Sequence, residues 1–308
     1  MKKQNARLYL FLIIIAAYLG IVFAYSPTRH ILDRYHLSAL QYNLLVLTIV
    51  LPLIAIWLIG YYGYIKMHNY SDTLPKNQEG RAVARLTNGV CLLVFQLPVS
   101  TLTATLMSRI ALSHPGFTAA STIISHYVGL ILPLMAFVFI SYGSRGLTES
   151  VKQRPSQRAT YILGLAFIII GAGFTYFVFR HGNVTSGASA ALVETDFFLP
   201  NWLLFFTIVV PYIFMWFIGV LAAYEIYLFQ QKVSGILFRR SWELLAAGLA
   251  WVILVSITLQ YLTTLSNHLA RLTTTGLLFV IYAILVILAA GFLLIAAGAN
   301  KLKRIEDV

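Results

Sequence analysis

The chain has 308 residues, of which 59% are hydrophobic and only 10% are charged, and its mean hydropathy is +0.82. These values exclude an ordinary soluble domain and place the chain among polytopic membrane proteins. The formal net charge of +12 must be judged by where the charges lie, and the lone cysteine, Cys91, excludes an internal disulfide and a CxxC site.

Eight apolar stretches are long enough to cross a hydrocarbon core of about 30 Å, which takes roughly 18 residues or more. Backbone polar groups in lipid must be satisfied within their own segment, so each stretch is expected to be an α-helix. The expected transmembrane helices are residues 8–25, 42–65, 83–108, 119–142, 159–180, 201–229, 242–265 and 274–298.

The first stretch imitates a signal peptide. Basic residues precede its apolar run, and Val22 and Ala24 occupy plausible cleavage positions. We nevertheless expect it to be retained, because it matches the fifth stretch in an internal duplication. Its removal would leave only three helices in the first half of the chain.

The second and sixth stretches are copies of one another. Residues 44–60 and 203–219 are identical at ten of seventeen positions with an offset of 159, which places Pro52 on Pro211. The same register aligns a threonine, a tryptophan and a glycine. Shared apolar composition would not align four unlike residue types, so the sequence indicates an internal duplication.

The duplication extends through the following stretches. The offset of 159 places Gly89 on Gly248, and after the loss of four residues an offset of 155 places Tyr127 on Tyr282. The sequence therefore predicts two tandem units, 1–150 and 151–308, with four helices each. An even number of helices returns the chain to its starting side, so the units are expected to be parallel, related by a pseudo-two-fold axis along the membrane normal.

Basic residues favour one side of this arrangement. Seventeen of the 22 Lys and Arg residues fall in the loops and tails on one side, and the other five are Arg29, Arg34, Arg109, Arg180 and Arg271. By the positive-inside rule, both termini are expected to be cytoplasmic in an integral, multi-pass protein of the cell membrane. This distribution explains the basic charge without nucleic acid.

No motif for catalysis, cofactor binding or metal binding is present, so we expect neither an enzyme nor a cofactor or metal site. Two acidic residues approach a transmembrane stretch, Glu225 and Glu243, and each lies near the expected cytoplasmic end of its stretch. We expect Glu225 to extend to the membrane interface. An interfacial aromatic belt is expected to include Tyr61, Tyr62, Tyr64, Tyr224 and Tyr227.

Polar residues within the apolar stretches form stripes at helical spacing. They either join helices by hydrogen bonds or line a polar cleft between the two units. The candidate pathway residues are Asn88, Gln96, Thr103, His126, Ser256, Gln260, Thr263 and Asn267, with a second stripe at Thr101, Thr105 and Ser108. The candidate kinks or hinges are Pro52, Pro98, Pro133 and Pro211.

Two functions of different classes fit this pattern. The first is a transporter or facilitator of a small solute, with a pathway between the units. The alternative is a non-catalytic membrane subunit or scaffold that binds another membrane protein or lipid. A membrane enzyme acting on lipid is a third reading, weakened by the lack of a catalytic constellation. The expected partners are membrane lipid and either a small solute or another membrane protein, with no nucleic acid.

Overall fold

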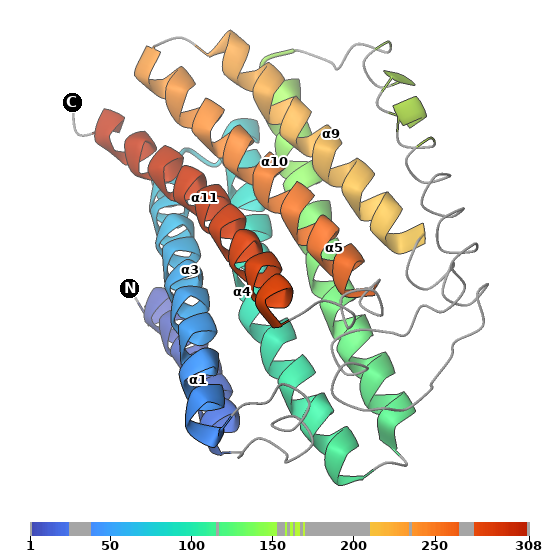
Figure 1. Ribbon diagram of the computed structural model, residues 1–308. Helices are drawn as coiled ribbons and strands as arrows, with labels where there is room; N and C mark the ends of the chain where they lie inside the picture. Colours follow the sequence, from blue (N-terminus) through green and yellow to red (C-terminus); the bar gives the residue numbers. More distant parts are fainter. Residues whose placement is uncertain are drawn as a thin grey trace.

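The computed structural model describes residues 2–24, 38–114, 117–152, 210–233, 236–264 and 274–306, and isolated positions between 158 and 169. All regular secondary structure in this part of the chain is helical. The long helices, shown in Figure 1, are α1 (Lys2–Ala24), α3 (Ala39–Thr73), α4 (Gln78–Ser113), α5 (Thr118–Ser150), α9 (Val210–Lys232), α10 (Ile236–Thr264) and α11 (Thr274–Glu306).

These helices coincide with all but one of the expected stretches, and the exception, residues 159–180, lies almost wholly outside the described residues. The prediction of an all-helical chain with long apolar helices is confirmed for the described residues. Helices α3, α4, α5, α9 and α11 contain segments long and apolar enough to cross a membrane, as a multi-pass protein requires. Those segments are Val46–Thr73, Gln78–Met107, Tyr127–Ser150, Ile213–Lys232 and Tyr282–Leu302.

Local chemistry sets the boundaries of α3 and α4. A capping box starts α3, in which the side chains of Ser38 and Gln41 each bond the other residue's backbone N–H. The turn after α3 contains Pro75, and the Asn77 side chain then accepts a 2.9 Å hydrogen bond from the Gly80 N–H, which caps α4. A Cβ on Gly80 would collide with the Pro75 carbonyl, so the turn requires glycine there.

Helices α4 and α5 pack closely through glycines. A Cβ on Gly89 would lie 2.8 Å from the Ile140 amide nitrogen and 2.9 Å from the Ala136 carbonyl oxygen. A Cβ on Gly143 would lie 2.7 Å from the Leu86 amide nitrogen. The two backbones therefore touch, as small residues allow in membrane helix pairs, and the contacts fix the helices as antiparallel.

Helices α10 and α11 pack in the same way. A Cβ on Gly248 would lie 2.8 Å from the Ile295 amide nitrogen and 2.9 Å from the Gly291 carbonyl oxygen, and one on Gly298 would lie 3.0 Å from the Leu245 amide nitrogen. Offsets of 159 on α10 and 155 on α11 relate each of these residues to the residue that makes the corresponding contact in the α4–α5 pair.

Six helices close into a ring in the order α3, α4, α5, α9, α10, α11, with α11 returning to α3 (Figure 1). Helix α1 packs outside the ring, against α3 and α4. Contacts of Gly60 with Phe292 and of Gly63 with Ala296 show that α3 and α11 run in the same direction. Consequently α3, α5, α9 and α11 run one way, whereas α1, α4 and α10 run the other.

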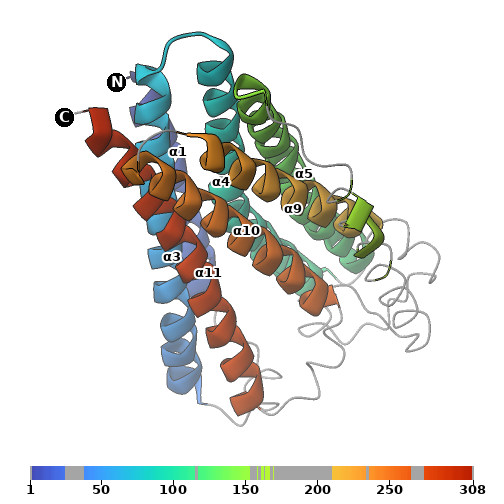
Figure 2. The ribbon, with the colours of Figure 1, turned by 90° about the horizontal axis from the view of Figure 1, so that it is seen from above.

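These directions bring many basic residues to one end of the bundle, which we call the basic end. Figure 2 shows the first turns of α1 and the last turns of α11 at this end. Its basic residues include Lys66, Lys76, Arg81, Arg85, Arg145, Lys152, Lys232, Arg239, Arg240 and Lys301.

Candidate functional site

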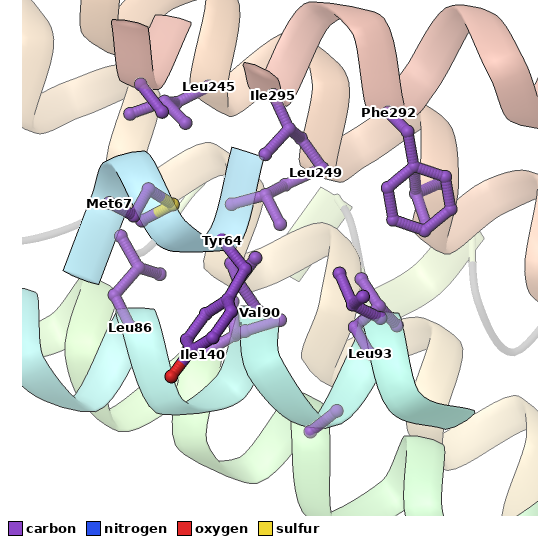
Figure 3. Close-up of a cluster of buried hydrophobic side chains, with 14 of the residues drawn as sticks. Tyr64, Met67, Leu86, Val90, Leu93, Ile140, Leu245, Leu249, Phe292 and Ile295 are labelled. Carbon is purple, nitrogen blue, oxygen red and sulfur yellow. The ribbon is translucent and has the colours of Figure 1, made fainter. Parts of the chain in front are cut away.

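Large apolar side chains fill the bundle next to the basic end. We call the residues that α4 and α10 contribute to this filling the apolar plug, and each of them is completely buried. They are Leu86, Val90 and Leu93 of α4 and Leu245, Leu249 and Val252 of α10. Figure 3 shows five of them in one cluster with side chains of α3, α5 and α11.

Two buried polar atoms of α4 lie beyond the plug, farther from the basic end. Gln96 is only 2% exposed, and its Oε1 atom makes no hydrogen bond within the described residues. The Ser100 Oγ atom, one turn farther along, is likewise buried without such a partner. The register that pairs Gly89 with Ile140 places Gln96 across from the buried Pro133 of α5, and the buried Pro98 follows Gln96 by two residues on α4.

The other candidate residues of α4 occupy different surroundings. Asn88 is exposed, on the same stripe of the helix as the exposed Arg81 and Arg85. Thr103 is half-buried. Eight residues separate Asn88 from Gln96, which at about 100° per residue turns them roughly 80° apart, enough to put one outside and one inside the bundle. The structure therefore does not bring Asn88 together with Gln96.

The remaining candidates are described less fully. His126 lies in α5, and Ser256, Gln260 and Thr263 lie in α10, but their side chains are outside the described part of the chain, as is all of Asn267. The prolines fall as expected within helices at Pro52, Pro98 and Pro133, whereas Pro211 is the second residue of α9, and the residues preceding that helix lie outside the described ranges.

The second predicted stripe is satisfied within its own helix. Thr101 Oγ1 donates to the Leu97 carbonyl oxygen at 2.8 Å, and Thr105 Oγ1 donates to the Thr101 carbonyl oxygen at 2.8 Å. Threonines bonded in this way present no free hydroxyl donor to a neighbouring helix or to a solute. The side chain of Ser108 lies outside the described residues.

Glu225 corrects one sequence prediction. It does not extend to the interface but is 5% exposed, and its Oε2 atom lies 2.5 Å from Ser144 Oγ of α5. Ser144 is itself completely buried. The sequence could not reveal this pair, because its members are 81 positions apart on helices that meet only in the folded ring.

The aromatic-belt prediction is also wrong for two of its five tyrosines. Tyr61 and Tyr64 are buried, whereas Tyr62 and Tyr227 are exposed and Tyr224 is partly exposed. Helix α1 covers them: Phe11 stacks on Tyr61 with ring centroids 4.6 Å apart, and the Arg7 guanidinium donates a hydrogen bond to the Tyr64 hydroxyl. Hence this face of α3 meets protein instead of the membrane interface.

Among the described residues, no group of three or more His, Cys, Asp or Glu side chains is placed to hold a metal ion. The chain matches no protein family, no curated protein and no solved structure.

Proposed function

We propose that the chain is a facilitator or transporter of a small polar solute, built from two parallel four-helix units with the pathway between them. The basic end faces the cytoplasm in this proposal, and the apolar plug closes the pathway on that side. The observation that carries the proposal is the pair of buried polar atoms, Gln96 Oε1 and Ser100 Oγ, on the far side of the plug.

The matched glycine contacts support the two-unit arrangement. The α4–α5 pair and the α10–α11 pair make equivalent backbone contacts at positions related by the sequence offsets. The contacts between the halves, α3 with α11 and α5 with α9, are likewise exchanged by a two-fold operation. A pathway on the axis between parallel units is a common arrangement in transporters built from such repeats.

The polar atoms beyond the plug support a solute site. A buried carbonyl or hydroxyl left without a hydrogen bond costs about 1–3 kcal/mol, so an apolar residue would make a more stable bundle at either position. A polar solute that enters from the side opposite the basic end would supply the missing partners. If these residues served only to join helices, their oxygen atoms would be expected to have partners on a neighbouring helix, which they lack within the described residues.

The test uses a panel of small polar and ionic solutes with the purified full-length chain. We expect at least one solute to raise the thermal unfolding temperature and to enter liposomes that contain the protein. Gln96→Leu should abolish both effects while it leaves the unfolding temperature without solute equal or higher. Asn88→Ala, at an exposed position of the same helix, is the matched control and should keep both effects. Solute effects that survive in Gln96→Leu would contradict the proposed site.

The apolar plug also favours the second candidate, a non-catalytic subunit or scaffold, because it closes the bundle at the basic end. That function predicts that no solute stabilises or crosses and that the chain purifies from its native membrane with a stoichiometric membrane partner. A solitary, monodisperse chain that transports a solute would exclude it.

The orientation has its own test. Lys76 and Lys232 both lie at the basic end, so tags inserted at these positions should be accessible only from the cytoplasmic side of the membrane. Access to the two tags from opposite sides would overturn the parallel two-unit arrangement.

A further inference from the structure

The seam between α5 and α9 contains a buried carboxyl group, that of Glu225. Glu225 lies within the apolar segment Ile213–Lys232, seven residues or about 10 Å from its end. Its Oε2 atom lies 2.5 Å from Ser144 Oγ, within the range of hydrogen bonds between oxygen atoms.

The Ser144 hydroxyl makes two short contacts with oxygen atoms. Ser144 Oγ lies 2.5 Å from Glu225 Oε2 and 2.9 Å from the Ser141 carbonyl oxygen. A serine hydroxyl carries one hydrogen, which makes a full-strength bond to only one acceptor at a time, and a carbonyl oxygen cannot donate. When Glu225 is protonated it can donate to Ser144, which in turn donates to Ser141, so that each contact is a full hydrogen bond; when Glu225 is ionised, the two acceptors compete for the single Ser144 hydrogen.

Loss of that proton leads to a different hydrogen-bond arrangement. Ionised Glu225 can only accept and is a stronger acceptor than the Ser141 carbonyl, so the Ser144 hydroxyl rotates toward the carboxylate and away from that carbonyl. The Ser141 carbonyl gives up a bond that is additional to the backbone ladder of α5. Gain or loss of one proton on Glu225 therefore switches the contact between α5 and α9 from one hydrogen-bond arrangement to the other.

Among the described residues, no basic side chain forms an ion pair with Glu225 that would hold it in its ionised form. On α5, Arg145 and Glu149 are the charged groups that act on Glu225, and they pair with each other at 3.2 Å on the exposed side of the helix. On its own helix, Glu225 is flanked by Tyr224 and Tyr227, and Lys232 is exposed at the helix end. On α10, which packs against the other side of α9, the charged residues Arg239, Arg240 and Glu243 are all exposed.

The equivalent seam shows that the fold does not need this pair. The offsets assign Lys66 of α3 to Glu225 and Ala299 of α11 to Ser144. Ala299 is completely buried, whereas Lys66 is partly exposed with its Nζ atom 5.1 Å from the centre of the Tyr62 ring. The same helix contact therefore closes without a buried acid.

We propose that Glu225 and Ser144 form a proton-binding site at the seam of α5 and α9. The ligand is a single proton, held on Glu225 Oε2 and released to water at the basic end, and its release rotates the Ser144 hydroxyl. The site does not depend on solute conduction, so it stands whether the chain is a transporter or a scaffold.

Infrared spectroscopy of the purified full-length chain at about pH 7 tests the site, because exposed carboxyl groups are ionised there. We expect the C=O stretching band of a protonated, hydrogen-bonded carboxyl group in the unsubstituted protein. The band should disappear in Glu225→Gln and change frequency in Ser144→Ala. Glu243→Gln, an exposed acid near the same end, is the matched control and should leave the band unchanged.

The infrared experiment still tests the site if one variant fails to fold. If Glu225→Gln cannot be purified, the frequency change in Ser144→Ala still assigns the band to this pair. Absence of the band from the unsubstituted protein, or a band that neither substitution alters, would overturn the proton site.

Discussion

Two seams of the bundle, α3 with α11 and α5 with α9, use different chemistry at positions that the sequence offsets relate. The α3–α11 seam relies on small residues, with Gly63 directly on the backbone of Ala296, and on a 2.6 Å hydrogen bond from the Tyr282 hydroxyl to Thr48 Oγ1. The α5–α9 seam has Ala222 at the position equivalent to Gly63, and it buries the acid–hydroxyl pair Glu225 and Ser144.

The comparison shows that small residues are enough to bring two such helices together and that the buried Glu225–Ser144 pair is not required for the contact. Close backbone approach suffices for the α3–α11 seam, because neighbouring membrane helices gain stability from tight packing. A buried carboxyl group adds little net stability and makes the seam sensitive to its protonation state. We therefore expect the α5–α9 seam, more than the α3–α11 seam, to respond to pH.

The largest expected effect breaks the small-residue seam. A Cβ on Gly63 would lie 3.2 Å from both the Ala296 nitrogen and its Cα, so Gly63→Leu must push α3 away from α11. We expect a loss of about 3 kcal/mol in the free energy of unfolding, measured by denaturant titration in mixed micelles. Gly20→Leu, where nothing lies within 4 Å, is the control and should change stability little. Equal stability of the two variants would contradict the close seam.

A smaller effect should follow from removal of the buried hydroxyl in the other seam. Ser144→Ala leaves Glu225 without its hydrogen-bond partner and should cost about 2 kcal/mol in the free energy of unfolding. The reverse change in the equivalent seam, Ala299→Ser, adds a hydroxyl that can bond its own helix, so the same titration should show almost no change. The comparison between seams fails if both substitutions have the same effect.

The smallest expected effect concerns the exposed hydrogen bond of the α3–α11 seam. Tyr282→Phe removes the donor to Thr48 and should cost about 0.6 kcal/mol, the usual value for a hydrogen bond between membrane helices. Tyr142→Phe, at an exposed tyrosine of α5, provides the baseline. A loss above that for Ser144→Ala would reverse the proposed ranking of polar contacts in the two seams.

Gln96 and Asn88 show how far the sequence could predict the candidate site. Their spacing placed both on one broad polar face of α4, but the ring buries Gln96 and leaves Asn88 exposed. In a membrane helix with apolar residues on most sides, periodicity indicates which residues share a face but not which face meets protein. The burial of Glu225 was also not predicted, because its partner Ser144 lies on a helix that is distant in the sequence.

The sequence by itself determined the helical character of the chain and the positions of most helices, whereas the glycines at which helices pack emerged from the structure. Apolar composition does this because backbone groups in lipid can be satisfied only within a helix. The tertiary structure decided which side chains are inside: Tyr61 and Tyr64 beneath α1, Gln96 beyond the apolar plug, and Glu225 against Ser144. Burial of these groups depends on the contact between one helix face and another, and that contact is created only when the ring closes.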